Sequence, residues 1–514
     1  MADWLGMAQV IVIGGGHNGL VCACFLAQAG QQVLVLEALD HLGGGSWSAD
    51  TIPGYRFDLH SVAHNMINMT SISAELGLGE VGLAYREMDP FSVGVGADGS
   101  MVRFHRSVEA TVESIAEVSL VDAVSYRKFI ARADKVLDAL LPTIRGDTEG
   151  SPASAGAVSR LLVAGAGSLA TELLRSYGGL LDRTFTTNRV RGPLAAFAAH
   201  ASVGPDMPRG ALFAFWQAAY HRFGQWHARG GSRALIDALS TRLAAWGGET
   251  QCSAPVHRIE TSAGRVTGVR LESGERIAAN KVVAALDPKL ALLEMLDPPL
   301  GGIAGRELSR TRRSNVVQAV IHIATSELPP YPRGIEGDWN GLQSFVADTD
   351  ELRTAWRSAD AGEVPERLPL YAFTTSAIDD TLTSAGQHTV YLACPATPFR
   401  VRGGWVARRD EFVDQALGRT EEVAPGFRAS VQGVAMRSPE DMEAGGRWPG
   451  AHPMHLDATA DQLGGRRPTR RLAHHRTPVG GLYISGAGTA PSGGILGTPG
   501  KLAAATVLAD LRDG

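Results

Sequence analysis

A strand, a glycine-rich loop, a helix and a second strand open this chain in direct succession, and their order constrains the fold more than any other feature. Val10–Ile13 is a β-branched run of the kind found in buried parallel strands. It leads into Gly14-Gly15-Gly16-His17-Asn18-Gly19, then a helical stretch over residues 20–28 and a second apolar strand over Val33–Leu36. This order predicts a Rossmann-like α/β domain that binds a dinucleotide at the end of its first strand.

The loop and the acid after the second strand hold the residue types that such a site needs. Gly14 and Gly16 permit a tight turn that brings backbone N–H groups to a pyrophosphate, and Gly19 lets the helix lie close to the sheet. Glu37 lies about 20 residues further on, where a carboxylate accepts hydrogen bonds from ribose hydroxyls. The cofactor contacts predicted here are Gly14, Gly16, His17, Asn18, Gly19 and Glu37.

A second glycine cluster follows the acid immediately. The glycine loop by itself does not distinguish FAD from NAD, but glycines at this place let the backbone pass against an extended FAD, and a simple NAD dehydrogenase has no need of them. The pattern is typical of FAD-binding domains of the glutathione-reductase type. It adds Ala38, Gly43, Gly44, Gly45 and Ser46 to the predicted cofactor contacts.

Composition excludes several other classes of protein. The 514 residues carry a formal net charge of -5, which argues against a nucleic-acid partner. The four cysteines form no CxxC or metal-ligand spacing, so we expect no metal site. Met1–Gln9 does not resemble a signal peptide, and no run of about 18 apolar residues predicts a membrane span. We therefore expect a cytoplasmic protein.

The C-terminal residues repeat the strand–loop–helix pattern. Leu482–Ile484 is a short apolar strand, followed by a glycine-rich loop over residues 485–497. Thr498 and Pro499 are typical of a helix start, and apolar residues recur at helical spacing as far as Leu511. The positive end of this helix would stabilise negative charge on a ligand in the loop.

With these motifs the chain resembles the phytoene-desaturase-like flavoproteins, which share the amine-oxidase superfamily fold. The resemblance lies in IGGGHNGLVCACFLAQAG, VLVLEA, GGGS and PGYRFDL near the N-terminus, and returns at residues 229–232, 281–288, 455–462 and 482–511. It implies that FAD is the cofactor, that Gly488, Gly494 and Ile495 lie against the flavin, and that Val256 meets the adenine. It also implies an FAD-binding domain from residues 8–70, 230–287 and 471–514, and an α+β substrate-binding domain from residues 71–229 and 288–470.

The substrate domain contains apolar helical stretches at residues 161–174, 194–201 and 211–220. They indicate either a tunnel or membrane-facing mouth for a lipophilic substrate, or ordinary helical core, and core is favoured over membrane contact. Tyr220, Trp226 and His227 form an aromatic and imidazole cluster that we interpret as a wall of the substrate pocket, although a core role is equally open.

Histidines are the candidates for proton transfer. His60 stands where relatives often have glycine near the flavin, and His64 would share its face if both lay on a helix. Either could accept a substrate proton, or could have a purely structural hydrogen bond. His452 and His455 have weak metal-ligand spacing. Substrate contact by His455 is favoured over metal binding, and a plain loop role is favoured over either. Lys501 lies in the first turn of the last helix and is expected at the surface.

These observations predict an FAD-dependent dehydrogenase or desaturase that removes hydride from a C–H bond of a small or lipophilic metabolite, with O2 or quinone as the electron acceptor. Two alternatives remain open from the residues. One is a redox-neutral isomerase that uses reduced flavin, and the other is a non-catalytic binding protein of the same fold.

Overall fold

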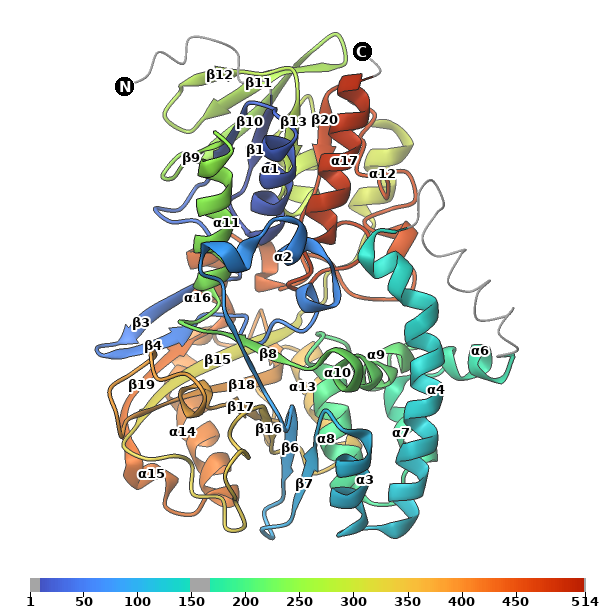
Figure 1. Cartoon of the computed structure of the whole chain (residues 1–514), viewed down its shortest axis with the longest axis vertical. Helices are drawn as coiled ribbons and strands as arrows, with labels where there is room; N and C mark the ends of the chain where they lie inside the picture. Colours follow the sequence, from blue (N-terminus) through green and yellow to red (C-terminus); the bar gives the residue numbers. More distant parts are fainter. Residues whose placement is uncertain (1–9, 148–166, 513–514) are drawn as a thin grey trace.

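A five-stranded parallel sheet forms the upper half of the molecule in the computed structural model, which describes residues 10–147 and 167–512 (Figure 1). Its strand order is β20-β13-β1-β2-β9, with β1 in the middle. Segments far apart in the sequence therefore lie side by side in one sheet. The strands are β1 (Val10–Ile13), β2 (Val33–Leu36), β9 (Glu249–Gln251), β13 (Val282–Ala284) and β20 (Leu482–Ile484).

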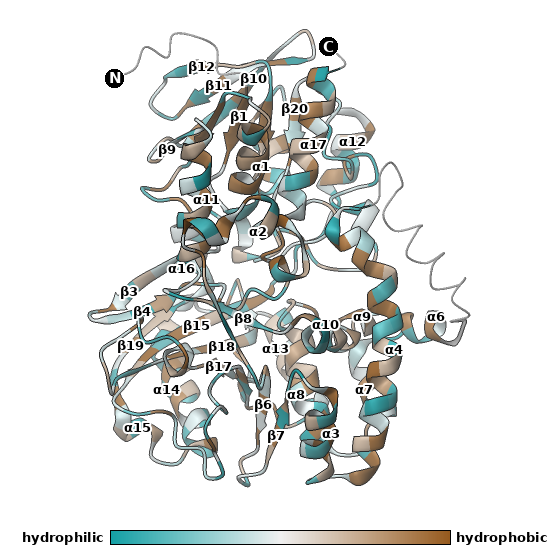
Figure 2. Cartoon of the chain, viewed as in Figure 1, coloured by the Kyte–Doolittle hydropathy of each residue, from teal (hydrophilic) through white to brown (hydrophobic). Residues whose placement is uncertain are grey.

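Both faces of this sheet are covered, which explains why its strands read as continuous apolar runs. Val10 and Val12 pack with α1 (His17–Gln28), α11 (Arg233–Ala245) and α17 (Thr498–Arg512). Ile11 and Ile13 point the other way, into a core shared with the small sheet. That sheet contains β10 (Val256–Ser262), β11 (Arg265–Leu271), β12 (Arg276–Ala278) and β14 (Leu296–Asp297). Figure 2 shows the hydrophobic residues concentrated in β1 and α1.

A seven-stranded sheet forms the lower half, in the order β19-β15-β18-β17-β16-β6-β7. Its two longest strands, β15 (Val316–Thr325) and β18 (His388–Pro398), are almost wholly buried, because helices pack against both faces of the sheet. The others are β6 (Ser92–Val95), β7 (Met101–Phe104), β16 (Leu342–Ser344), β17 (Tyr371–Phe373) and β19 (Val431–Arg437).

Helices complete the lower half. One face of the sheet packs against α14 (Trp405–Val423), and the other packs against a helical layer that borders the cavity described below. That layer consists of α3 (Val108–Ala116), α4 (Leu120–Arg145), α6 (Gly167–Leu173), α7 (Tyr177–Thr184), α8 (Asn188–Ala199), α9 (Ala211–Phe215) and α10 (Gln217–Phe223). Shorter or peripheral elements are α2 (Ile72–Glu75), α12 (Gly302–Ser309), α13 (Thr349–Asp360), α15 (Phe427–Ser430) and α16 (Pro439–Gly446).

The apolar stretches predicted from the sequence are mostly internal. Residues 194–201 and 211–220 fall on α8, α9 and α10, whose apolar side chains join the largest core cluster. Within the predicted stretch 161–174, residues 161–166 lie outside the described part of the chain, and α6 occupies the rest. Within the ranges 10–147 and 167–512, no helix combines the length and hydropathy that crossing a bilayer requires.

One hairpin joins the two halves. β3 (Ser48–Ile52) and β4 (Tyr55–Asp58) follow the second glycine cluster directly, yet they pack on the seven-stranded sheet. Phe57 stacks on His322 of β15 with ring centroids 4.6 Å apart, and Thr51 Oγ1 is 2.9 Å from His322 Nδ1. The loop after β4, which carries His60 and His64, is therefore held between the two sheets.

Candidate active site

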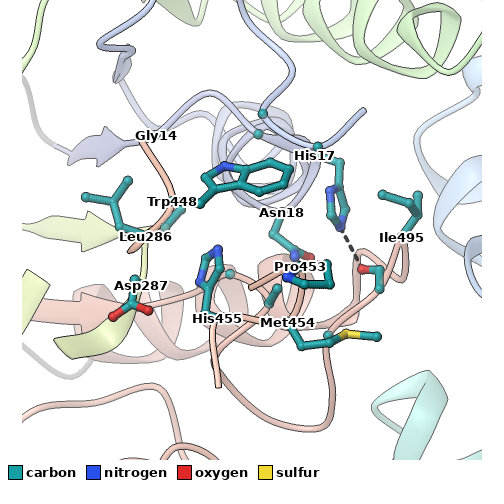
Figure 3. A pocket seen from close by; sticks show the side chains of 18 of the residues that line it. Gly14, His17, Asn18, Leu286, Asp287, Trp448, Pro453, Met454, His455 and Ile495 are labelled. Carbon is teal, nitrogen blue, oxygen red and sulfur yellow. Dashed lines mark hydrogen bonds between the residues drawn. The ribbon is translucent and has the colours of Figure 1, made fainter. Parts of the chain in front are cut away.

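A cavity of about 680 Å³ runs between the two halves of the molecule. At one end it is lined by the carboxyl ends of β1 and β2 and by the start of α1. At the other end it is lined by α4, α8, α9 and α10. Figure 3 shows the side chains of His17, Asn18, Trp448 and His455 around the same space. The cavity thus joins a nucleotide-type loop to the helical layer of the lower half.

The first glycine loop has the geometry of a close backbone approach. Gly14 has φ +100, and a Cβ there would lie 2.9 Å from the carbonyl oxygen of Ala285. A Cβ on Gly19 would overlap the carbonyl oxygen of Gly14, so only glycine lets α1 begin so close to β1. Both line the cavity together with Gly16. The structure thus requires glycine at positions 14 and 19, whereas a Cβ on Gly16 would meet only the Gly43 oxygen at 4.0 Å.

Glu37 is held rigidly at the end of β2. Its Oε2 accepts the Gly15 N–H at 2.7 Å and its Oε1 accepts the Leu39 N–H at 2.9 Å. The side chain is buried but lines the cavity beside Ala38, and Val256 of β10 lines the same end. A carboxylate with two donors still has free lone pairs, so it can accept further hydrogen bonds from a ligand hydroxyl.

The second glycine cluster lies directly against the first. The Gly43 N–H donates to the carbonyl oxygen of Gly15 at 2.9 Å, and the Ser46 N–H donates to that of Gly43 at 2.9 Å. Gly44 and Gly45 line the cavity, whereas Gly43 and Ser46 stand behind its wall. Gly43 and Ser46 thus shape the loop, and their neighbours are placed to contact a ligand.

The two ends of the chain meet at this cavity. His17 Nε2 lies 3.1 Å from the carbonyl oxygen of Gly494, drawn as the dashed line in Figure 3. Burial lowers the pKa of His17 to about 4, so the ring is neutral and its Nε2–H donates to the carbonyl. A Cβ on Gly500 would overlap the backbone oxygen of Asn18, so the first turns of α1 and α17 touch.

The C-terminal loop contributes lining and close packing at different positions. Gly494 and Ile495 line the cavity. Gly488 does not, but a Cβ there would lie 2.5 Å from Pro288 Cδ and 3.3 Å from His455 Cβ, so glycine allows the loop to pack close to its neighbours.

The residues present fit a dinucleotide. Three buried polar atoms on lining side chains, Asn18 Oδ1, Asn65 Oδ1 and His455 Nδ1, have no hydrogen-bond partner in the described part of the chain. The first turns of α1 and α17 lie together and place two partial positive charges beside the cavity. The glycine-lined wall leaves room for phosphates and a ring against backbone.

Comparison with known proteins identifies that dinucleotide. The sequence pattern of flavin containing amine oxidoreductases matches residues 19–329, more than half of the chain. The chain belongs to this family. It is an FAD-dependent oxidoreductase, and the prediction of FAD from the paired glycine clusters is confirmed.

Relatives extend over almost the whole chain. A mouse pyridine nucleotide-disulfide oxidoreductase domain-containing protein 2 is 28% identical, with 98% of this chain and 94% of the relative covered. One of the polypeptides of limonene dehydrogenase from Castellaniella defragrans is 25% identical, covering 98% and 95%. A lycopene-forming phytoene desaturase of Paracoccus is 22% identical, covering 98% and 97%. The predicted resemblance to phytoene-desaturase-like flavoproteins is confirmed.

Solved structures show the same fold. Cyclohexylamine oxidase from Brevibacterium oxydans superposes with a TM-score of 0.59 at 17% identity, covering 99% of this chain and 100% of that one. An oxidoreductase from Methanosarcina mazei gives a TM-score of 0.61 at 17% identity, covering 98% and 100%. The Rossmann-like FAD-binding fold predicted from the sequence is thereby confirmed.

Of the two histidines predicted to transfer protons, only His60 lines the cavity. It follows β4 in an irregular loop, not on a helix as the shared-face argument required, and its ring lies 4.4 Å from that of Trp448. Burial, followed by the nearby Arg437 charge, lowers its pKa well below the ordinary value. His64 is fully buried behind the wall, where its Nδ1 lies 3.1 Å from the Tyr85 hydroxyl.

The predicted substrate-binding residues divide in the same way. Tyr220 and His455 line the cavity. His227 is fully buried, and its Nε2 lies 3.0 Å from Asp379 Oδ2. Burial is the largest single effect and opposes protonation of His227, but the Asp379 hydrogen bond and the charges of Asp58 and Asp379 together outweigh it, so the pKa is raised. Trp226 donates its indole N–H to the carbonyl oxygen of Phe223 at 2.7 Å. His227 and Trp226 therefore belong to the packing behind the cavity.

Two further hypotheses concerned a metal site and the position of Lys501. No group of three or more His, Cys, Asp or Glu side chains within residues 10–147 and 167–512 could hold a metal ion. Lys501 forms an ion pair with Glu75, with Nζ 2.7 Å from Oε1, and does not line the cavity. The surface interpretation of Lys501 is confirmed.

Sequence reasoning left a tunnel open for residues 194–201 and 211–220, which supply much of the wall of the helical end, but of these residues it singled out only Tyr220. That wall is made mainly of apolar and aromatic side chains, with Asn65, Thr143, His200 and Gln318 among its polar members. The only sequence signal for the apolar residues of this wall was an apolar helix face, and that pattern is the same whether the face borders a core or a cavity. The apolar lining residues are Met66, Leu140, Ile144, Phe197, Leu212, Phe213 and Trp216.

Proposed function

We propose that this protein is a dehydrogenase or desaturase that removes hydride from a C–H bond of a neutral, lipophilic small molecule. The observation that carries the proposal is the helical end of the cavity. Its lining in the described part of the chain is mainly apolar and aromatic, its polar side chains, among them Thr143, His200 and Gln318, are uncharged, and it has no Asp, Glu, Lys or Arg. Burial of this kind stabilises apolar surface by roughly 25 cal/mol per Å².

The helical end of this cavity is unfavourable for a charged substrate. Burying a cationic amine without a carboxylate leaves an unpaired charge, which costs several kcal/mol. Four acids line the cavity, and none lies at its helical end. Asp287 and Glu272 are paired with Arg313 and Arg447, Glu37 stands at the nucleotide end, and Glu294 lies beside Arg258 of β10. The relatives named for limonene and phytoene support a lipophilic substrate in preference to an amine.

The chain's own side chains provide placement and water exclusion. Bound FAD supplies the hydride acceptor. The Phe197, Phe213 and Trp216 rings line the space in which a substrate would lie, and close packing there keeps water from the reacting bond. His60 is neutral at physiological pH because of its lowered pKa, so it can accept a hydrogen bond, but it is a weak base.

Anaerobic half-reactions test the proposal. The FAD-loaded protein is mixed with neutral terpenes, long-chain alcohols and ketones, and with primary amines of similar size, while flavin absorbance is followed. Bleaching by a neutral lipophile, reversed by O2 or by a soluble quinone, supports the proposal and identifies the electron acceptor. Bleaching by amines alone would overturn it. Turnover that needs pre-reduced flavin and consumes no acceptor would indicate isomerisation instead.

A further inference from the structure

We propose that His200 and Gln318 form a hydrogen-bonding end of the cavity that binds one neutral polar group, a hydroxyl or carbonyl oxygen, of an otherwise apolar substrate. The inference deepens the proposed function and rests on it. Both residues line the cavity from the lower half of the molecule. They stand out because most of the side chains around them at this end are apolar or aromatic.

His200 is placed to meet a ligand. It follows α8 directly, and its ring packs over Tyr371 of β17 with centroids 5.2 Å apart. The ring is accessible, yet the protein around it lowers its pKa to about 4 by desolvation. Both facts are explained if the accessible face opens into the cavity and not into bulk water. No side-chain hydrogen bond or ion pair links His200 to the rest of the described chain.

Gln318 is fixed in orientation by its neighbours. Its Nε2 donates to the carbonyl oxygen of His200 at 3.1 Å, and its Oε1 accepts the Tyr371 hydroxyl at 3.0 Å. A carbonyl oxygen only accepts, so this contact determines which end of the amide carries nitrogen. One Gln318 N–H remains beyond these two bonds. Together with the neutral imidazole, it gives the cavity end two donors and one acceptor.

The chemistry of this end selects neutral oxygen. A neutral imidazole offers no positive charge to a carboxylate, and no acidic side chain in the described part of the cavity end offers a partner to an ammonium. A hydroxyl or carbonyl oxygen can pair with the unpartnered His200 ring nitrogens without burying a charge. Phe197 and Ala201 beside it suit the apolar remainder of such a molecule.

The test compares probes that differ only in their end group. Octane, 1-octanol, 2-octanone, octanoate and octylamine are titrated anaerobically into the FAD-loaded protein, and dissociation constants are read from the flavin difference spectrum. His200→Phe retains a ring that can stack on Tyr371 and removes both ring nitrogens. We expect this substitution to raise the dissociation constants of 1-octanol and 2-octanone by about three- to tenfold, which corresponds to the loss of one hydrogen bond. The dissociation constant of octane should change by less than about twofold.

Matched variants separate binding from folding. His474→Phe, at an exposed histidine outside the cavity, should leave all five dissociation constants unchanged. His200→Asn retains hydrogen-bonding groups and should restore part of the preference for the alcohol and ketone. If His200→Phe does not retain FAD, Gln318→Met provides the same comparison by removing the other donor.

Several results would overturn the inference. One is that His200→Phe changes the dissociation constants of octane and octanol equally, or changes neither. Another is that octanoate or octylamine binds more tightly than octanol to the unaltered protein. The last is that no probe binds at all. The proposed function fails separately, because it requires flavin reduction by a neutral lipophile. An unaltered protein that discriminates the probes but is reduced only by amines would retain this inference and reject the dehydrogenase proposal.

Discussion

Arg467 offers the sharpest test of how the cavity wall is built. Its side chain is fully buried, and its guanidinium donates to the carbonyl oxygens of Ala487 (3.0 and 2.9 Å), Asp457 (3.2 Å), Gln462 (2.8 Å), Leu456 (3.1 Å) and Met454. Three cavity-lining residues, Met454, His455 and Ala487, lie on the segments that it joins. We expect Arg467→Met to loosen that wall.

The size of the effect follows from the contacts. Three of these carbonyls, those of Ala487, Leu456 and Gln462, would be left without a donor, because Met454 O still accepts the Leu456 N–H and Asp457 O still accepts from Gln462 Nε2. An unsatisfied buried acceptor costs about 1–3 kcal/mol, so the three together cost about 6 kcal/mol at the middle of that range. Against this, burial lowers the pKa of Arg467 from 12.5 to about 10, and removal of that desolvated charge returns about 3 kcal/mol. The free energy of unfolding should therefore fall by about 3 kcal/mol, the difference between these two values.

The assay pairs Arg467→Met with Arg471→Met. Arg471 forms an exposed ion pair with Glu307 at 3.4 Å, and such pairs contribute about 0–1 kcal/mol. Urea unfolding gives the stability, and the ratio of flavin to protein absorbance after gel filtration gives FAD retention. Arg467→Met should lower both the stability and the FAD retention, and Arg467→Lys should lower them to a smaller extent. Arg471→Met should leave both unchanged. If Arg467→Met matches its control in both measurements, the reasoning from buried carbonyls is wrong.

Three further outcomes follow from the same site. Gly19→Ala should purify without FAD, because its Cβ overlaps a backbone oxygen, whereas Gly301→Ala, with nothing within 4 Å, should stay yellow. Glu37→Gln should weaken FAD binding by about tenfold or more in flavin-fluorescence titrations, because it loses charge-assisted hydrogen bonds; unchanged affinity would contradict the role assigned to the acid. His17 and His455 have pKa values of about 4 in the folded protein and 6.5 in the unfolded chain, so between these values the unfolded state binds more protons. The free energy of unfolding therefore falls as the pH drops from 6.5 to 4, by about 1 kcal/mol per pH unit for each histidine. Urea unfolding at pH 7, 6 and 5 checks this, and His17→Gln should reduce the slope.

Local spacing was enough to predict the nucleotide end of this protein. Val10–Ile13 alternates between two buried faces, Gly14 and Gly19 are needed where backbone atoms nearly touch, and Glu37 ends the second strand. Each of these structural requirements involves only a few consecutive residues, so the residue types at those positions are enough to predict the local structure. FAD followed from the second glycine cluster and from the resemblance of the two chain ends to known flavoproteins.

Long-range packing decided the rest. His60 and His64 are four residues apart, yet only His60 reaches the cavity, because the loop after β4 is held between two sheets and does not form a helix. The long strands β15 and β18 escaped prediction because their runs, buried on both faces, lack the alternation of a half-exposed strand. The low pKa of His200 likewise depends on residues distant in sequence that surround its ring. Whether an apolar helix face borders a core or a substrate is decided by what packs opposite it, and only the tertiary structure determines that.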